Sequence, residues 1–286
     1  MTIAGALLVV TLVSLLATLL VSLISLTIRI AAPAHPAEGP AVETPARPLR
    51  TVVDAGLLLS LALGVATLIA RAALTGHAPW SNLHEFSQAF AVALLATYLG
   101  LARRMPIGDL APLIALVAAV LVAYALTLPD DILPLVPALQ APLLLTVHVG
   151  AAMLAYAMSG VAFAAAVAEL LQRRAGDRIA MLPTAAAAAT AAHRSVVIAF
   201  PILTAAILLG SVWANLAWRS YWNNDPKELA AAATWLVYAA YLHVSVRHDR
   251  WAGYAPWLLV LGFAAVLFTF LGAGLLFVGQ HSYAAS

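Results

Sequence analysis

Two histidines that lie far apart in the sequence flank a segment rich in tryptophan. His148 and His281 each stand near the end of a hydrophobic stretch, and residues 213–228 between them contain Trp213, Trp218 and Trp222. Imidazole is a common metal ligand, and indole rings supply large, rigid contact faces. Two imidazoles with a planar aromatic shelf between them suit a flat, apolar, iron-bearing macrocycle, because histidine is an axial ligand of haem iron. The pattern makes this a candidate haem site, in which Arg219 or Lys227 could pair with the propionate carboxylates.

A third histidine, His243, is embedded in a hydrophobic stretch. At a helical rise of ~1.5 Å per residue it lies ~22 Å beyond Glu228 along the same helix. An ionisable side chain at membrane depth is costly and by default indicates function. We therefore treat His243 as a candidate functional residue.

Each of these features also has a purely structural explanation. Tryptophan and tyrosine gather at membrane interfaces whatever the function of the protein, and a single histidine at a helix end serves as an interfacial polar group. Asp225 and Pro226 form a good helix start, with Asp225 as the N-cap and proline at the first helical position. Glu228 then stands in the first turn, where the helix dipole favours a carboxylate. Taken alone, these residues leave the haem site and the structural interpretation both open.

The composition predicts an all-α, polytopic integral membrane protein. Of the 286 residues, 64% are hydrophobic and 9% are charged, whereas soluble domains have about 25% charged residues. About 20 apolar residues span the hydrocarbon core as a helix, and lipid offers no partners to unpaired backbone groups. We predict about eight transmembrane helices, near residues 3–30, 51–74, 86–102, 110–128, 143–171, 195–217, 228–246 and 255–278.

The placement of the basic residues predicts the orientation. With the N-terminus outside, the inner side receives most of the 14 Lys and Arg residues, as the positive-inside rule requires. Those residues are Arg29, Arg47, Arg50, Arg103, Arg104, Arg173, Arg174, Arg178, Arg194, Arg247 and Arg250. Both termini then lie on the outer side. Residues 1–286 form a single membrane domain, and residues 213–228 are its outer tryptophan-rich loop. The connector 172–194 is expected to carry a short interfacial helix along its alanine run.

Composition also limits the chemistry and the partners. The chain has no cysteine, which excludes a disulfide framework, a thiolate metal site and a CxxC redox pair. The net charge is +2 and the basic residues are dispersed, so no nucleic acid is expected as a partner. The lipid bilayer is the expected surroundings.

Five sequence words resemble the CcsA/ResC family of cytochrome c biogenesis proteins. Residues 218–228 (WRSYWNNDPKE) resemble the family's WWD signature, WGxxWxWDPKE, and residues 234–243 (TWLVYAAYLH) look like the helix that follows it. Residues 279–283 (GQHSY) are similar to the family segment GxHSYG. The segment around His148 is similar to HVxxMxLxY, and residues 76–85 (GHAPWSNLHE) are similar to GHxPxSNxYE. The words occur in family order over about three quarters of the chain. Three positions depart from the pattern, namely Arg219 for Gly, Asn224 for Trp and His84 for Tyr.

The resemblance implies a role for each matching residue. His148 and His281 would be the outer axial ligands of haem b, which is the cargo, and the WWD loop with Trp213, Trp218, Trp222, Asp225 and Glu228 would hold it. His243 would bind haem within the membrane, with a second histidine from a ResB/CcsB-like partner. The protein would export haem and attach it covalently to CxxCH apocytochrome c, as a subunit of a two-component cytochrome c synthase. A bacterial inner membrane with the haem loop facing the periplasm is expected, and a thylakoid membrane is the alternative.

Other interpretations remain open at this stage. A haem-delivery subunit resembling CcmC would make no thioether, a cofactor-free secondary transporter would use the aromatic residues as a gate, and a structural subunit would need no ligand. His77 and His84 are read as an interfacial pair in a structured turn of an outer loop. His35, His193 and His248 are read as solvated residues of inner loops.

Overall fold

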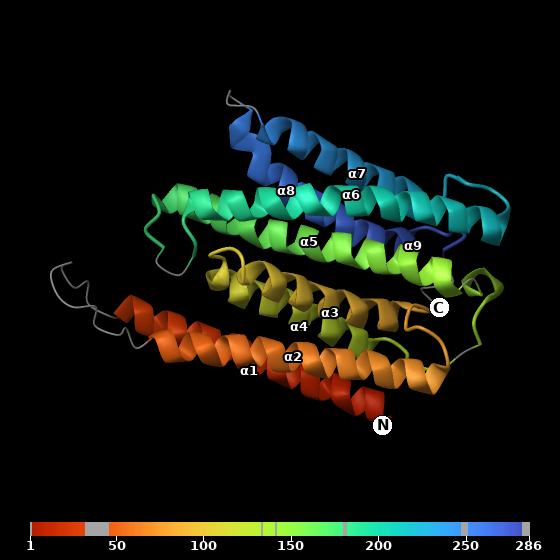
Figure 1. Cartoon of the computed structure of the whole chain (residues 1–286), viewed down its shortest axis with the longest axis horizontal. Coiled ribbons are helices and arrows are strands. Elements are labelled where there is room, and N and C mark those ends of the chain that lie inside the picture. The colour runs from red at the N-terminus through yellow and green to blue at the C-terminus, as the bar shows by residue number, and fades with distance from the viewer. Residues whose placement is uncertain are drawn as a thin grey trace.

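A computed structural model shows a bundle of long helices that run roughly parallel or antiparallel to one another (Figure 1). The structure describes residues 2–31, 46–132, 134–140, 142–179, 182–246 and 251–281. His35 and His248, together with Ser282 and Tyr283 of the C-terminal word, lie outside these residues. No strand is present in the described part of the chain.

The helices are arranged in successive pairs across the bundle. Helices α1 (Ile3–Ala31) and α2 (Ala46–Thr75) form one flank, and α3 (Leu83–Ala102) and α4 (Ala111–Thr127) pack beside them. The central pair is α5 (Pro142–Ala175) and α6 (Ala185–Trp218). The other flank comprises α7 (Pro226–Ser245) and a last span made of α8 (Ala255–Leu267), a π-helical segment η4 (Phe268–Gly272) and α9 (Ala273–Leu276), as Figure 1 shows.

Length and composition confirm a polytopic membrane protein. Within the described residues, seven helical segments are long and apolar enough to cross a bilayer. The prediction of about eight spans differs from this number by α7, a 20-residue helix that begins with charged residues and carries His243 in its last turn. Side chains on the outer faces of α1 and α2 are exposed leucine, isoleucine and valine, as expected of a surface that lies in lipid.

The connector between α5 and α6 corrects two expectations. No separate interfacial helix stands among its described residues, because α5 continues to Ala175 and the alanine run forms the first turns of α6. The Gln172 amide donates hydrogen bonds to the carbonyl groups of Ile179, Leu182 and Pro183, at 2.8, 3.1 and 3.2 Å, which holds this short connection in place. His193 therefore lies on α6, half-buried and with its ring centroid 6.3 Å from that of Tyr241. The prediction of a solvated loop histidine was wrong.

Four connecting segments meet at one end of the bundle. These are the segments before α3, before α5, between α6 and α7, and after α9, and α1 begins toward the same end (Figure 1). Side chains from these segments and from the adjoining helix turns form the candidate site.

Candidate haem site

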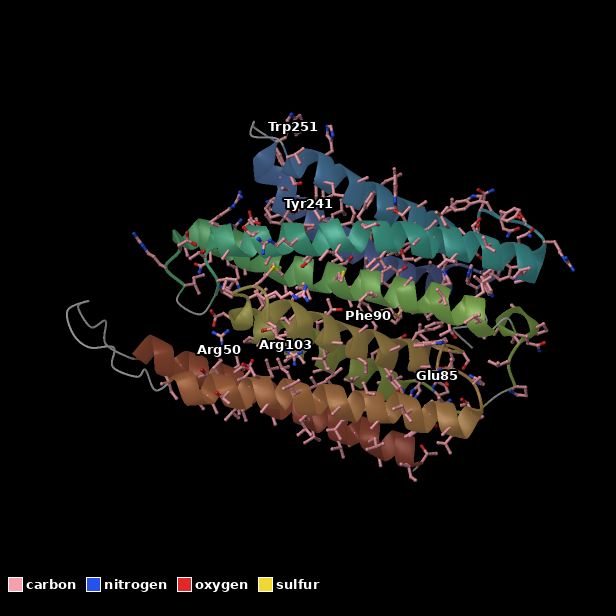
Figure 2. The ribbon with its side chains drawn as sticks, viewed as in Figure 1. Arg50, Glu85, Phe90, Arg103, Tyr241 and Trp251 are labelled. Carbon is pink, nitrogen blue, oxygen red and sulfur yellow. The ribbon has the colours of Figure 1, made fainter. Side chains whose placement is uncertain are left out.

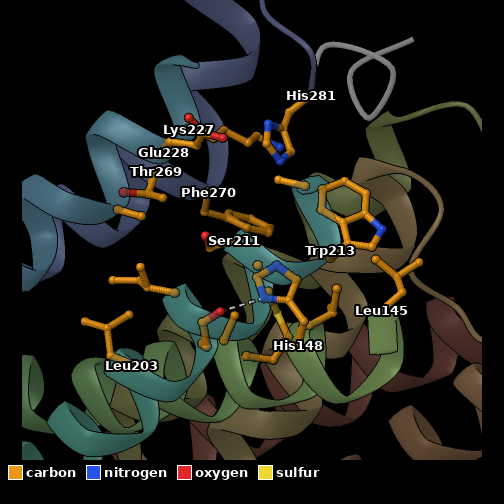
Figure 3. Close-up of a pocket in the computed structure, with 18 of the residues that line it drawn as sticks. Leu145, His148, Leu203, Ser211, Trp213, Lys227, Glu228, Thr269, Phe270 and His281 are labelled. Carbon is orange, nitrogen blue, oxygen red and sulfur yellow. Dashed lines mark hydrogen bonds between the residues drawn. The ribbon is translucent and has the colours of Figure 1, made fainter. Parts of the chain in front are cut away.

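A pocket of about 1120 Å³, measured with its open mouth, lies at this end of the bundle (Figure 3). Its walls come from α5, α6, α7, the π-helical segment and the C-terminal tail, and they are mostly apolar, as ligand pockets generally are. Five residues predicted for the site line it, namely His148, Trp213, Trp222, Glu228 and His281. Residues from distant parts of the sequence thus meet in one cavity.

His148 is held against α6 by a hydrogen bond that sets its tautomer. Its Nδ1 lies 2.8 Å from the carbonyl oxygen of Ala206. A carbonyl only accepts, so Nδ1 carries the proton and Nε2 bears the lone pair of the neutral ring. Metal-binding histidines are commonly oriented in this way, with the second ring nitrogen donating to a carbonyl or carboxylate.

Gly210 gives the imidazole of His148 its space. A β-carbon built at Gly210 lies only 2.7 Å from Cε1 and 3.1 Å from Nδ1 of His148. The helix backbone can approach the ring this closely because position 210 has no side chain.

We predict that Gly210→Ala displaces His148 while α6 remains intact, because alanine is the better helix former. The bond to Ala206 should lengthen, and haem bound at His148 should shift from a low-spin to a high-spin spectrum. Absorption spectra of the purified variant check this, with Gly150→Ala as the control, because a β-carbon at Gly150 meets no atom within 4 Å. An unchanged low-spin spectrum in Gly210→Ala would contradict it.

His281 is oriented by Asp225, and this contact joins two motifs that lie far apart in the sequence. Its Nδ1 lies 2.8 Å from Oδ1 of Asp225, and the other carboxylate oxygen accepts the backbone N–H of Gln280 at 2.6 Å. Because an ionised carboxylate only accepts, His281 also donates from Nδ1, and Nε2 is the unprotonated nitrogen of its neutral ring. A β-carbon at Gly279 would overlap the Asp225 carboxylate, so the tail needs glycine there in order to approach.

Asp225 also starts α7 as the sequence predicted. Its side chain accepts the Lys227 backbone N–H at 2.9 Å, and Oε2 of Glu228 accepts the backbone N–H groups of Asn223 and Asp225 at 2.8 and 3.2 Å. This is a capping box. The structural interpretation of Asp225 and Glu228 is therefore correct, and Asp225 additionally fixes His281.

The environment of Asp225 predicts a pH-dependent attachment of the tail. Burial opposes ionisation, but the hydrogen bond and charge of His281 and the bonds from Lys227 and Gln280 prevail and hold the pKa of Asp225 at about 2. This folded-state pKa lies below the unfolded value, so the attachment contributes stability above about pH 4. That stability is lost as the pH falls toward 2.

We expect the midpoint temperature of thermal unfolding in detergent to fall over this pH range. The fall should be smaller in Asp225→Asn, which keeps the side-chain shape but does not titrate. Unfolding curves between pH 6 and 2 measure both proteins, and equal slopes would contradict the assignment.

Trp213 lies close to both imidazoles. It is 2% exposed, its ring stacks on that of His148 at 6.3 Å with an 8° interplanar angle, and its centroid is 5.6 Å from that of His281. Trp218 meets both Trp213 and His281 edge-on, at 4.7 and 4.8 Å. Both histidines thus contact one indole at the same end of the bundle.

The tryptophan-rich segment is mainly helical, contrary to the prediction of a loop over residues 213–228. Trp213 and Trp218 belong to the last turns of α6, and α7 begins at Pro226. Helical geometry is what carries Trp213 into the pocket and leaves Trp218 behind it, outside the pocket lining. Trp222, in the connection itself, is 41% exposed and lines the mouth of the pocket.

The structure shows the backbone conformation at two positions where the chain departs from the family signature. Arg219 is the C-cap of α6 and has a left-handed backbone with φ of 60°, the conformation for which the signature's glycine is best suited. Asn224 also has a positive φ of 55°, which asparagine tolerates, and its side-chain oxygen accepts the indole N–H of Trp222 at 2.9 Å. The third departure, His84, is buried on α3 and donates from Nδ1 to the carbonyl of Ala125 at 2.8 Å.

The other histidines that the structure describes do not line the pocket. His84 lies in the first turn of α3 and ties it to α4, so the prediction of an interfacial loop position was wrong for it. His77 is half-buried and its Nδ1 bonds the Ala78 carbonyl at 2.9 Å. His243 stands on an exposed position in the last turn of α7, at the opposite end of that helix from Glu228.

Sequence reasoning missed a buried ion pair beside the site. Nε of Arg71 lies 2.8 Å from Oε1 of Glu85, and the guanidinium also donates to the carbonyls of Asp130 and Asp131 at 2.6 and 3.1 Å. Oε2 of Glu85 accepts both the backbone N–H and the hydroxyl of Ser81, at 2.8 and 2.7 Å. The motif at residues 76–85 thus carries the carboxylate of Glu85, which pairs with Arg71 on α2. The spacing of the residues in the sequence does not reveal this pairing.

That ion pair connects to the pocket through the segment before α5. Arg71 holds the start of this segment, and farther along it the Ala138 carbonyl accepts the indole N–H of Trp213 at 3.0 Å. The segment therefore holds the buried indole of α6 through this hydrogen bond.

Sequence reasoning also missed several pocket residues, among them Met153, Tyr156, Ser211, Thr269 and Phe270. The π-helical segment that carries Thr269 and Phe270 has no sequence signature, although π-bulges are frequent at functional sites.

Comparison with known proteins identifies the family of the chain. The model of the family described as cytochrome C assembly protein matches residues 80–281. The CcsA cytochrome c biogenesis protein of Parasynechococcus marenigrum (strain WH8102) is 35% identical over 265 residues, covering 79% of this chain and 85% of that protein. The CcsA protein of Guillardia theta is 32% identical over 235 residues, covering 73% and 77%.

A solved structure shares the fold. Cytochrome c Heme Lyase CcmF superimposes with a TM-score of 0.65 at 22% sequence identity, covering 95% of this chain and 47% of CcmF, so this chain spans about half of that protein. The family match covers most of the chain and includes both His148 and His281. The chain belongs to the cytochrome c assembly protein family, and its role is in cytochrome c biogenesis.

Proposed function

We propose that this membrane protein binds haem b in the pocket between His148 and His281 and presents it for covalent attachment to apocytochrome c. The observation that carries the proposal is the convergence of the two imidazoles on Trp213, each with Nδ1 bound to an acceptor. This arrangement gives both rings the tautomer in which Nε2 binds a metal. The apolar walls suit the macrocycle.

The protein's own residues bind, orient and protect the cargo. His148 and His281 are the axial ligands, Trp213 and Trp218 set the aromatic floor behind them, and Trp222 covers the mouth of the pocket. Asp225 and Glu228 hold the loop and the tail so that His281 reaches the iron. Bound haem supplies the vinyl groups that are to be modified.

The attachment itself forms two thioethers. Each cysteine S–H of a CxxCH apocytochrome adds across one vinyl group, so that the sulfur bonds to the carbon next to the ring and the proton goes to the terminal carbon. No group leaves and no net oxidation occurs. The histidine of the CxxCH segment then replaces one axial imidazole, which releases the product.

Haem reaches this pocket, in our proposal, from within the membrane. His243 is exposed near the far end of α7, where a ligand from a ResB/CcsB-like partner can complete an intramembrane haem site. The pocket end of the bundle then faces the periplasm or an equivalent outer compartment, with this chain acting as one subunit of a cytochrome c synthase.

The absorption spectrum of the affinity-purified protein tests the proposal. We expect a Soret band with low-spin α and β bands on reduction, because two imidazoles coordinate the iron. A colourless protein that takes up no added haem would contradict it and favour the cofactor-free transporter, which the family membership already disfavours. Co-purification with a large ResB-like protein, as against a small haem chaperone, would separate a synthase from a delivery subunit.

A further inference from the structure

Lys227 is a basic side chain of the pocket whose ammonium group forms no hydrogen bond or ion pair with the residues that the structure describes. It is the only lysine in the sequence, it lines the pocket, and its side chain extends from the start of α7 toward His281 (Figure 3). Among the described residues, Nζ of Lys227 makes no hydrogen bond, and no carboxylate lies within ion-pair distance of it. Its terminal atoms rest near Gly274 of α9, with ordinary contact distances of 3.4 and 3.7 Å to a β-carbon built there.

The neighbouring carboxylates are already used. Asp225 accepts the backbone N–H groups of Lys227 and Gln280 and the imidazole of His281. Oε2 of Glu228 accepts the backbone N–H groups of Asn223 and Asp225. An ammonium group in a mostly apolar pocket is costly unless an anion pairs with it. The pocket thus offers a positive charge to an anionic group of whatever binds there.

We propose that Lys227 is the carboxylate-binding residue of the pocket and pairs with a propionate of the bound porphyrin. This inference rests on the proposed haem site and deepens it. This ion pair directs the propionate edge of the macrocycle toward the start of α7 and the opposite edge away from α7. Arg219, the other basic residue in this part of the chain, is exposed and does not line the pocket.

The test compares two probes that differ at the propionate groups. These are iron protoporphyrin IX, which carries two carboxylates, and its dimethyl ester, in which both groups are uncharged. The wild-type protein in detergent should bind the free acid about tenfold more tightly than the ester, because a hydrogen bond to a charged group has roughly that effect. Lys227→Met should lose this preference by binding the acid more weakly, with little change for the ester. Lys227→Arg should keep it, because arginine also pairs with carboxylates.

Arg219→Met is the matched control, because it removes one positive charge at the same end of the bundle but outside the pocket lining. It should keep the wild-type preference. The inference is overturned if the wild-type protein binds both probes equally, or if Arg219→Met rather than Lys227→Met abolishes the preference. Failure of the wild-type protein to bind either probe would instead reject the haem site itself, so the two failures are distinguishable.

Discussion

Replacing His148 or His281 by alanine is expected to abolish low-spin haem binding in the pocket. In the proposed site each ring supplies one axial nitrogen, and each has its Nδ1 bonded to a fixed acceptor, Ala206 or Asp225. Loss of one ring leaves the iron with a single protein ligand, so the variant should lose most of its haem or retain it in a high-spin form. Imidazole added to the buffer should restore part of the low-spin spectrum, because it can occupy the vacated position.

His77→Ala is the matched control for this experiment. His77 lies in the connection before α3, and it bonds a carbonyl of its own loop without lining the pocket. Haem content per protein, measured by the pyridine haemochrome spectrum, should equal that of the wild type in this variant. Unchanged haem content in both His148→Ala and His281→Ala would refute the ligand assignment.

Removing the guanidinium of Arg71 is expected to cause the largest loss of stability. The side chains of Arg71 and Glu85 are 3% and 0% exposed (Figure 2 labels Glu85). Arg71→Met leaves the Glu85 carboxylate buried without its counterion and frees the carbonyls of Asp130 and Asp131. Breaking a buried ion pair from one side costs about 3–5 kcal/mol, so the thermal unfolding midpoint in detergent should fall strongly.

Two further variants make the interpretation specific. Arg71→Met combined with Glu85→Leu should recover part of the loss, since no uncompensated charge then remains. Arg174→Met removes an exposed arginine at the other end of the bundle and should change the midpoint little. If Arg71→Met behaved like Arg174→Met, the ion pair would not be what holds the segment before α5.

Much of the fold and part of the site follow from local sequence patterns. Apolar runs of spanning length dictate helices, because a lipid-exposed backbone must satisfy its own hydrogen bonds. Asp225, Pro226 and Glu228 specify the start of α7 through interactions within one turn, so spacing alone identifies them. His148, His281 and the tryptophans between them could be named as a candidate site because their residue types are rare and chemically distinctive.

The prediction failed where helix ends depend on packing. The alanine run before His193 contains no residue that breaks a helix, so α6 begins at Ala185, earlier than the predicted span 195–217. Residues 213–228 were predicted as a loop because of their tryptophan-rich signature, although the predicted span 195–217 overlaps them, and α6 in fact persists to a left-handed cap at Arg219. His84 was predicted to lie at the membrane interface, but its Nδ1 bonds the Ala125 carbonyl of α4, a contact that the sequence does not reveal.

By itself the sequence determined a helical membrane protein with two histidines suited to an iron-bearing cargo, because these properties reside in composition and short spacings. Only the tertiary structure decided how those histidines are used. The bond from His281 to Asp225, the space above Gly210 and the pairing of Arg71 with Glu85 each join elements from different parts of the chain. Such contacts depend on how helices pack against one another, and neither hydropathy nor local spacing encodes that directly.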